Sequence, residues 1–331
     1  MKKIILMAFV FGLTTFLPNN SHAFVLKDFA IFATERAKIG GGSIVKGGLT
    51  GSDQEVRLAS GTEVDGVAGA GKLTGNNGVT IYGDVVYDGT MKLGSGGDIY
   101  GDVDVDGNAV LHSSEIHGDL TVSGSLTNFS TVTGTITAPG SPVPYVGPTL
   151  PAATAFSAGG ASIANNASGQ SVTLAPGTYG VFDLHGFNNT LKLSAGNYYF
   201  DSFRIGSGGD IQFDLTGGNV NLYIVGDMLW GNTVHSSLIG GDSTQIYTEL
   251  HGKWHNSGGG NYYGVVYAPF DDIVLANNFD HVGALYSGKE INLQHGVTVN
   301  FVPVPEPLSA ALLGIGFLGA ARLRKKHKVV V

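Results

Sequence analysis

Apolar and polar residues alternate in short runs along most of this chain. Val103-Asp104-Val105 and Leu120-Thr121-Val122 are two examples, and glycine or aspartate separates one such run from the next. An alternation with a period of two, broken at short intervals by turn residues, predicts short β-strands rather than helices. We therefore expect an all-β protein.

The runs in the N-terminal half recur as a unit. Each unit is built around a glycine followed by aspartate, or threonine in the last copy, between apolar residues, and successive units lie 18, 17 and 16 residues apart. The copies are Ile81–Val85, Ile99–Val103, Ile116–Leu120 and the weaker Val132–Ile136. A nearly constant step of this size indicates a repeat architecture in which each unit forms one turn of the chain.

The C-terminal half repeats at a longer step. Asparagine or aspartate recurs about every 22 residues, and the segment Gly94–Ile99 of the first half reappears as Gly206–Ile211. The recurring residues are Asn166, Asn188, Asp210, Asn232, Asn256, Asn278 and Asn300. The shared segment indicates that both halves are variations on one coil.

A coil of this length holds about three short strands and cannot bury its apolar side chains alone. Stacked coils solve the problem, because each strand pairs with its equivalent one coil along and the inward residues form a continuous core. We predict a parallel β-helix (β-solenoid), right-handed, with coils ~4.8 Å apart. We expect the recurring asparagines to form a hydrogen-bonded ladder and glycine to occupy the tight corners.

Proline divides the chain into parts. Pro139, Pro142, Pro144, Pro148 and Pro151 are too dense for a regular strand ladder. We therefore predict an N-terminal solenoid with coils of about 17 residues over 24–138, a proline-rich linker over 139–153, and a C-terminal solenoid with coils of about 22 residues over 154–302. Residues 26–38 predict either a short helix that caps an open solenoid end or one more irregular strand.

The N-terminus has the pattern of a secretory signal peptide. Lys2 and Lys3 precede an apolar run, and small residues stand at Ser21 and Ala23. This pattern predicts a signal helix within residues 1–23 and cleavage after Ala23, which would leave Phe24 as the first residue. An uncleaved anchor is the alternative.

The C-terminus combines a short motif, an apolar run and a basic end. Pro305, Glu306 and Pro307 precede the uncharged run 308–321. The basic end consists of Arg322, Arg324, Lys325, Lys326 and Lys328. As a helix the run would span only ~21 Å, less than a ~30 Å hydrocarbon core, so it predicts transient rather than permanent anchoring, with the basic end in the cytoplasm.

This tail, residues 303–331, resembles the PEP-CTERM sorting signal. The resemblance implies a Gram-negative bacterium, with signal peptidase and an exosortase-type membrane protease as partners. It further implies transient inner-membrane anchoring before the protein reaches the cell surface or extracellular matrix. An ordinary C-terminal membrane helix that is never cut is the alternative. The Gly-Asp repeats resemble, more loosely, bactofilin-type and other bacterial surface β-solenoids, which concerns the fold alone.

Charge and composition exclude some classes of binding partner and some kinds of chemistry. Outside the two terminal signals, 11 Lys and Arg remain against 25 Asp and Glu, a net charge of −14 before any histidine charge. This balance argues against nucleic acid and anionic lipid as partners. The chain has no cysteine, which excludes disulfides and thiolate chemistry.

An acidic stripe is the first candidate for chemistry. Asp84, Asp102 and Asp119 should stack on one corner, where aspartate ordinarily caps backbone amides in turns. Calcium binding and glycan cleavage are alternatives. However, the stretch from Gly94 to Leu191 has no Lys or Arg to partner the carboxylates.

Histidines and aromatic residues of the C-terminal half form a second group of candidates. The histidines are His235, His251, His255, His281 and His295. Their spacing within glycine-rich strand segments makes a metal site the less favoured interpretation. The aromatic residues are Trp230, Trp254, Tyr262, Tyr263, Tyr267 and Phe270, which could line a sugar-binding groove or belong to the core.

These observations predict a non-enzymatic, secreted surface or matrix β-solenoid, with exopolysaccharide or biofilm as its setting. They identify no catalytic, cofactor-binding or metal-ligating residue. A glycan-active β-helix lyase or hydrolase is the first alternative. An ice-binding or self-assembling solenoid is the second, although Thr133, Thr135 and Thr137 form the only short Thr-x-Thr run.

Overall fold

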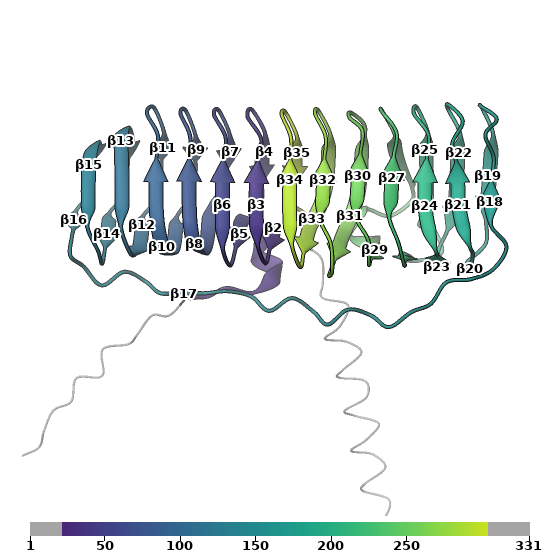
Figure 1. The fold of residues 1–331 in the computed structure, drawn as a ribbon, viewed down its shortest axis with the longest axis horizontal. Helices are drawn as coiled ribbons and strands as arrows, with labels where there is room; N and C mark the ends of the chain where they lie inside the picture. Colours follow the sequence, from purple (N-terminus) through teal and green to yellow (C-terminus); the bar gives the residue numbers. More distant parts are fainter. Residues whose placement is uncertain (1–21, 304–331) are drawn as a thin grey trace, which may run out of the picture.

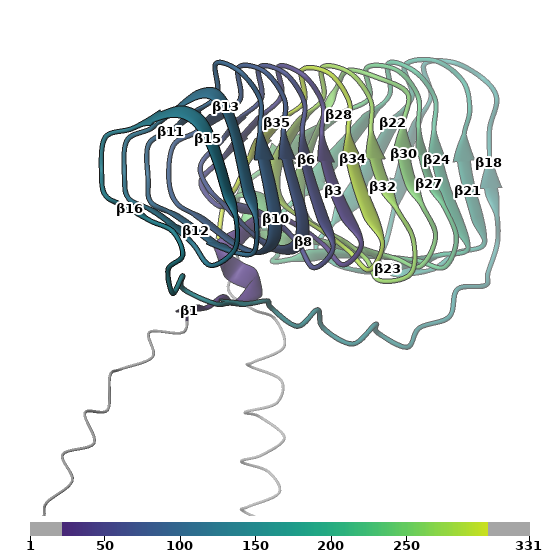
Figure 2. The same cartoon turned by 60° about the vertical axis from the view of Figure 1, so that its left-hand side comes forward.

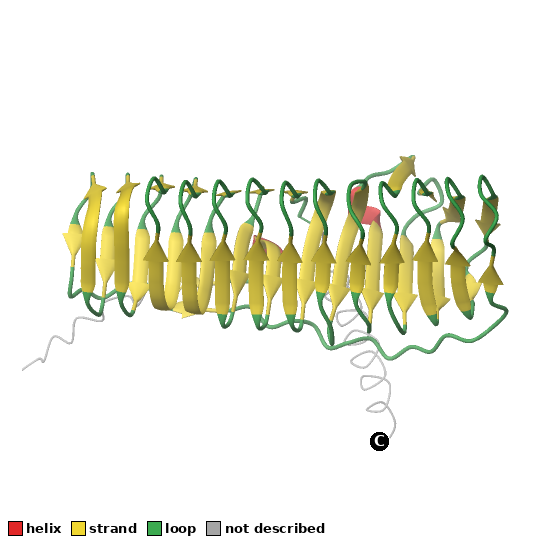
Figure 3. Ribbon diagram, turned by 45° about the horizontal axis from the view of Figure 1, so that its top comes forward, coloured by secondary structure: helices red, strands yellow, loops and turns green. Residues whose placement is uncertain are grey.

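The computed structural model describes residues 22–303, and these residues form an all-β parallel solenoid of about 14 turns (Figures 1 and 3). The described helical structure consists of two 3₁₀ turns, η1 (Leu26–Asp28) and η2 (Ser243–Gln245). The predicted sorting helix and all but the last two residues of the predicted signal peptide lie outside the described residues. The predicted all-β parallel solenoid is confirmed.

The strands stack into three faces, which we name A, B and C in the order in which the chain visits them. All strand pairs are parallel, as the stacking of equivalent strands from successive coils requires. Face A contains β20 (Gly177–Thr178), β23 (Gly196–Phe200), β26 (Val220–Ile224), β29 (Ile246–Leu250), β2 (Phe29–Ala33), β5 (Leu49–Ser52), β12 (Val103–Asp106), β14 (Leu120–Val122) and β16 (Ile136–Thr137). Face B contains β18 (Ile163–Ala164), β21 (Val181–Leu184), β24 (Ser202–Ile205), β27 (Met228–Trp230), β30 (Trp254–Asn256), β32 (Ile273–Leu275), β34 (Glu290–Leu293), β3 (Arg36–Ile39) and β6 (Glu55–Leu58).

Face C and several longer strands complete each coil. Face C contains β19 (Ser171–Leu174), β22 (Thr190–Ser194), β25 (Asp210–Asp214), β28 (His235–Ile239), β35 (Thr298–Asn300), β4 (Ile44–Lys46), β7 (Glu63–Val64), β9 (Thr80–Ile81) and β11 (Asp98–Ile99). Strands that turn a corner and serve two faces are β8 (Val67–Gly75) and β10 (Val85–Leu93) on A and B, β13 (Ala109–Ile116) and β15 (Leu126–Val132) on B and C, and β31 (Asn261–Ala268) and β33 (Asp280–Ser287) on C and A. A separate pair, β1 (His22–Ala23) and β17 (Tyr145–Val146), lies outside the coils.

The two halves form one rod, but in the reverse of their order in the sequence. The last coil of the C-terminal half stacks on the first coil of the N-terminal half: β33 pairs with β2, β34 with β3, and β35 with β4. The strands that meet at this seam, in the middle of the rod, are not consecutive in the chain, and the two halves are joined only by the segment between β16 and β18 (Figure 1). The first and last coils of the solenoid therefore meet at mid-length, and the rod ends are formed by β14–β16 and β18–β20.

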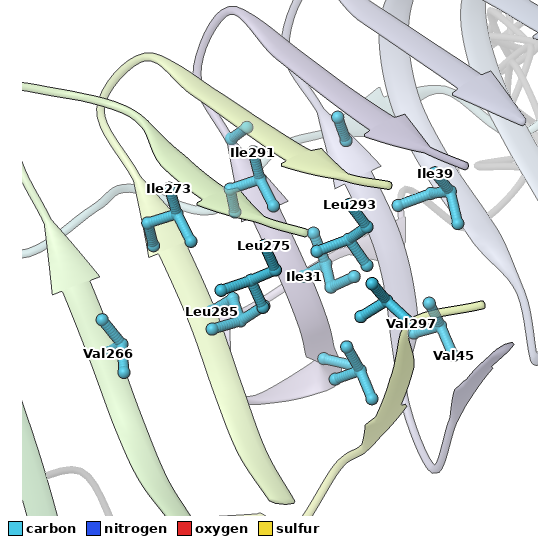
Figure 4. Close-up of a cluster of buried hydrophobic side chains, with 14 of the residues drawn as sticks. Ile31, Ile39, Val45, Val266, Ile273, Leu275, Leu285, Ile291, Leu293 and Val297 are labelled. Atoms are coloured by element: carbon cyan, nitrogen blue, oxygen red, sulfur yellow. The ribbon is translucent and has the colours of Figure 1, made fainter. Parts of the chain in front are cut away.

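The core runs through the seam without interruption. Ile31, Ile39 and Val45 of the N-terminal half lie beside Leu285 and Leu293 of the C-terminal half (Figure 4), and all are at most 1% exposed. At roughly 25 cal/mol per Å² of buried apolar surface, this packing is the main force that holds the halves together.

A return segment connects the far ends of the rod. Residues 138–162 leave β16 at one end and run along face A to β18 at the other (Figure 2). Tyr145 lies 3.3 Å from the Asp53 carboxylate, and Tyr267 donates a hydrogen bond to the backbone carbonyl of Pro151. The sequence placed the start of the C-terminal solenoid at residue 154. In the structure residue 154 still belongs to the return segment on face A, and the first solenoid strand after the prolines is β18.

Residues in left-handed conformation mark the corner between faces B and C. Asn188 (φ 55°) and Asn278 (φ 56°) occupy this corner, as do Gly208 (φ 69°) and Gly296 (φ 69°) in neighbouring coils. Asparagine and glycine suit this conformation, because a bulkier side chain is strained there.

The expected asparagine ladder is wrong. Asp210 lies in β25 and Asn256 ends β30, so the recurring residues do not share one column. The constant step hid unequal coils, since equivalent positions joined by hydrogen bonds are 19 residues apart at Gln170–Asn189 but 26 apart at His235–Asn261. Turns absorb the extra residues.

The helix considered for residues 26–38 is also wrong, and the strand alternative is confirmed. Only the short turn η1 is helical, and β2 and β3 follow it as solenoid strands. In β3 the inward residues Ala37 and Ile39 alternate with the outward residues Arg36 and Lys38, which is the period of two of a strand. The segment lies at the seam, so it caps neither end of the rod.

Candidate functional site

Cationic side chains gather on one face of an otherwise acidic solenoid. The outward positions of face B or its edge hold Arg36, Lys38, Arg57, Lys72, Lys92, Arg204 and Lys253. The first five belong to four adjacent strands, β3, β6, β8 and β10. We call these five residues the basic strip.

Strand register places the basic strip in two columns. In one column Lys38 pairs with Arg57, which is followed by Thr74 and Lys92 on the next two coils. In the other column Arg36 pairs with Glu55, which is followed by Lys72 and Thr90. Since neighbouring strands lie ~4.8 Å apart, the strip presents positive charge at regular intervals along the rod.

Two recessed carboxylates support the strip at the seam. Glu55 accepts hydrogen bonds from Arg36 Nε at 2.7 Å and Arg57 Nε at 2.6 Å. Glu290 lies 3.0 Å from Arg36 Nη1 and 2.8 Å from Lys38 Nζ. The Glu55 side chain is only 11% exposed, whereas that of Arg57 is 51% exposed. The carboxylates thus lie below the cationic groups, which face the solvent.

The protonation of this network follows from its hydrogen bonds. Burial alone would raise the pKa of Glu55, but the hydrogen bonds from Arg57 and Arg36 outweigh burial and hold that pKa below its ordinary value. The hydrogen bond to Glu55 raises the pKa of Arg36. Glu55 and Arg36 are therefore both charged at neutral pH.

Lys72 and Lys92 carry the strip beyond this network. Both side chains are exposed, and neither has an ion-pair partner among residues 22–303. Lys38 and Arg57 are like charges directly opposite each other, an arrangement that is unfavourable in a sheet unless something else compensates it. Five cations against the two carboxylates Glu55 and Glu290 leave the strip with an excess of positive charge, which can bind a polyanion.

Negative charge lies mainly on another part of the surface. Face C carries outward carboxylates at Glu63, Asp98 and Glu115, and Asp84 and Asp102 lie at the corner between faces C and A. The net charge of the chain is therefore an average over faces of opposite character. On face B the excess of cations lies over β3, β6, β8 and β10, whereas Arg204 in β24 lies beside the outward carboxylate Asp183.

The aspartates of the acidic stripe cap backbone amides in turns, as the sequence predicted. Asp84 Oδ1 accepts the backbone N–H of Asp102 at 2.9 Å, and Asp102 Oδ1 accepts that of Asp119 at 2.8 Å. Asp119 Oδ1 continues the series with Thr135 at 2.7 Å. These carboxylates stabilise the stacking of successive corners.

Most of the candidate aromatic residues belong to the core or are covered. Trp230, Trp254 and Tyr262 are at most 2% exposed, and Tyr267 is 3% exposed. The hypothesis that these side chains line a sugar-binding groove is therefore wrong. Phe270, at a turn after β31, is 54% exposed, and its ring lies 5.0 Å from that of His251.

The histidines do not form a cluster. His255 is outward on face B, His235 contacts Asn261, and His281 is fully buried. Within residues 22–303 no three His, Asp or Glu side chains are arranged to hold a metal ion.

The predicted processing sites fall at or beyond the edge of the described structure. Ala23 lies in β1, where it pairs with Val146. Pro305, Glu306, Pro307 and the basic end lie outside the described residues. In the part of the chain that the structure describes, no helix has the length and apolar character needed to cross a membrane.

Comparisons with known proteins add little to this picture. No family model and no curated protein matches the chain. Among solved structures it is similar to an ice-binding protein from an Antarctic Flavobacteriaceae bacterium, with 13% identity, a TM-score of 0.30, and 85% of this chain and 98% of that chain covered. A glycosylated ice-binding protein from an Arctic yeast gives 15% identity, a TM-score of 0.35, and coverage of 85% and 94%. A possible adhesin C-terminal domain from Caldicellulosiruptor kronotskyensis gives 10% identity, a TM-score of 0.23, and coverage of 88% and 96%. These likenesses are too weak to assign a function.

Sequence reasoning missed the basic strip altogether. Its members lie far apart along the chain, at Lys38, Arg57, Lys72 and Lys92, and nothing local connects them. A signal was nevertheless present, because the steps between them are close to the coil length of the N-terminal repeat. Placing every Lys and Arg on that repeat would have aligned them.

Proposed function

We propose that this chain is a non-enzymatic, extracellular β-solenoid that binds acidic polysaccharide through the basic strip of face B. The observation that supports the proposal is the gathering of most cations of an acidic body onto one face, with Lys72 and Lys92 exposed and unpaired by any carboxylate within residues 22–303. A stiff row of charges suits a linear polymer, because several weak contacts can form along one chain.

The chemistry favours a polymer of carboxylated sugars over nucleic acid. Single exposed ion pairs contribute only ~0.2–1 kcal/mol each, so the strip should bind weakly and reversibly. Duplex DNA carries a charge about every 1.7 Å, and the acidic corners and face C would repel so dense a polyanion. A more sparsely charged polysaccharide can lie on face B alone.

Export is part of the same proposal. The leader that would end at Ala23 and the tail built on Pro305, Glu306 and Pro307 support processing by signal peptidase and an exosortase-type protease. The protein would then reach the cell surface or an exopolysaccharide matrix. The intact mass of protein recovered from the surface of its native host should correspond to a chain that starts at Phe24 and lacks the basic end. An intact mass that includes the basic end would contradict the sorting proposal.

Binding is tested with polygalacturonate as an acidic probe, and dextran and duplex DNA as comparisons. We expect the full chain, kept in mild detergent, to bind polygalacturonate but not dextran, and to lose that binding as salt rises from 0.05 to 0.5 M, because the Debye length shortens to a few ångströms. Equal binding of dextran would contradict the electrostatic mechanism. Tighter binding of DNA than of polygalacturonate would contradict the polysaccharide assignment.

A further inference from the structure

The two ends of the rod expose unpaired strand edges. Within residues 22–303, β15 and β16 pair only with β13 and β14 at one end. At the other end β18, β19 and β20 pair, among the same residues, only with β21, β22 and β23. Each intervening coil has a neighbour on both sides. Edge strands with free backbone groups are templates for further pairing unless a cap covers them.

The cores of the end coils are also open. At the β16 end, Ile136 is 47% exposed and Leu126 is only partly buried, whereas their strand partners one coil inward, Leu120 and Ala109, are 0% exposed. At the β18 end, Ile163 and Val172 are partly buried, although their strand partners in the next coil are fully buried. Both ends thus present a ring of backbone groups around partly exposed apolar side chains.

We propose that each end binds the opposite end of a second copy of this chain, in a head-to-tail stack. The chain circulates through faces A, B and C in one sense throughout. After β16 on face A, the next strands of a continued solenoid would lie on B, C and A. The opposite end supplies β18, β19 and β20 on those faces, in that order and direction.

The seam shows that such a joint works in this protein. There, β33, β34 and β35 stack on β2, β3 and β4 with parallel pairing, although these strands are not consecutive in the chain and the return segment joins the two halves only at their far ends. The two rod ends have similar perimeters, since equivalent positions are 16 residues apart at Ser114–Ser130 and 19 apart at Gln170–Asn189. The joint is heterologous and does not close on itself, so it leads to filaments rather than rings.

The test uses the full chain in mild detergent, followed by sedimentation velocity and electron microscopy. Wild-type protein should form rods that lengthen as concentration rises. Ile136→Lys at one end and Val172→Lys at the other should each give monomers, because a charge enters the joint. Leu229→Lys, an exposed apolar position on face B away from both ends, is the matched control and should assemble as wild type.

Mixing the two end variants distinguishes this joint from other association. Each variant keeps one intact end, so an equimolar mixture should form dimers that grow no further. Wild-type protein that stays monomeric at all concentrations, or association that persists in both end variants, would overturn the proposal. If circular dichroism shows that a lysine variant is unfolded, Ile136→Ser and Val172→Ser repeat the test with a smaller change.

Discussion

At the scale of single residues, His281 is the most unusual group in the core. It is 0% exposed, and its ring lies 6.2 Å from that of Tyr262 and 6.1 Å from that of Trp254. Burial lowers the pKa of His281 to about 3. The side chain is therefore neutral in the folded protein at any physiological pH.

This burial makes stability depend on pH. The unfolded chain takes up a proton near pH 6.5 and the folded chain only near pH 3, so the folded state loses stability as pH falls through that interval. At 1.36 kcal/mol per unit, the loss approaches about 4–5 kcal/mol at the acid end. We expect His281→Phe to reduce the difference in urea midpoint between pH 7 and pH 4. An unchanged pH dependence in this variant would show that other groups cause it.

At the scale of elements, one buried carboxylate fastens the later part of the return segment to face A. Glu249 is 1% exposed and accepts hydrogen bonds at 2.6 Å from both the backbone N–H and the hydroxyl of Thr154. Phe156, two residues on, packs its ring 4.3 Å from that of His251. These contacts fasten residues 154–156 above the solenoid.

Removing this carboxylate should release the segment. Each hydrogen bond to a charged group contributes about 1.5–3 kcal/mol, so Glu249→Ala should open residues 154–156 to proteolysis several-fold faster than in wild type. Glu35→Ala removes an exposed carboxylate elsewhere and should leave cleavage unchanged. Equal protection of the segment in Glu249→Ala would show that its aromatic contacts suffice.

The sequence could predict those strands that belong to repeats of nearly constant length. The Gly-Asp units gave the correct register, since Asp84, Asp102 and Asp119 do stack at the predicted steps of 18 and 17 residues. The asparagine series failed, because turns of unequal length shift residues such as Asp210 and Asn256 out of register. Handedness stays a prediction.

The seam and the basic strip could not be predicted from the sequence, because both depend on pairing between distant strands. No local pattern states that β35 will stack on β4, because that pairing depends on the path of the return segment between the rod ends. Similarly, Lys72 and Lys92 become neighbours only once the register is known. Periodicity predicts the coil, and long-range pairing decides where its surface chemistry gathers.

At the scale of the whole molecule, the first and last coils of the solenoid meet at mid-rod. Phe301 N–H donates to the Lys46 carbonyl at 2.7 Å, and the Tyr286 hydroxyl donates to the Leu26 carbonyl at 3.1 Å. A membrane tether beyond Pro303, which the sequence predicts, would therefore hold the rod at its middle. Both rod ends and face B would then remain free for the contacts proposed above.

The most direct measurement compares polygalacturonate affinity between two charge variants at low salt. Lys72→Gln/Lys92→Gln removes the exposed cations of the strip without breaking an ion pair, and Lys46→Gln/Lys192→Gln removes two outward lysines of face C. At ~0.5–1 kcal/mol per contact, the first variant should bind roughly 10-fold more weakly than wild type, and the second should bind as wild type. Equal affinities for all three proteins would contradict a binding site on face B.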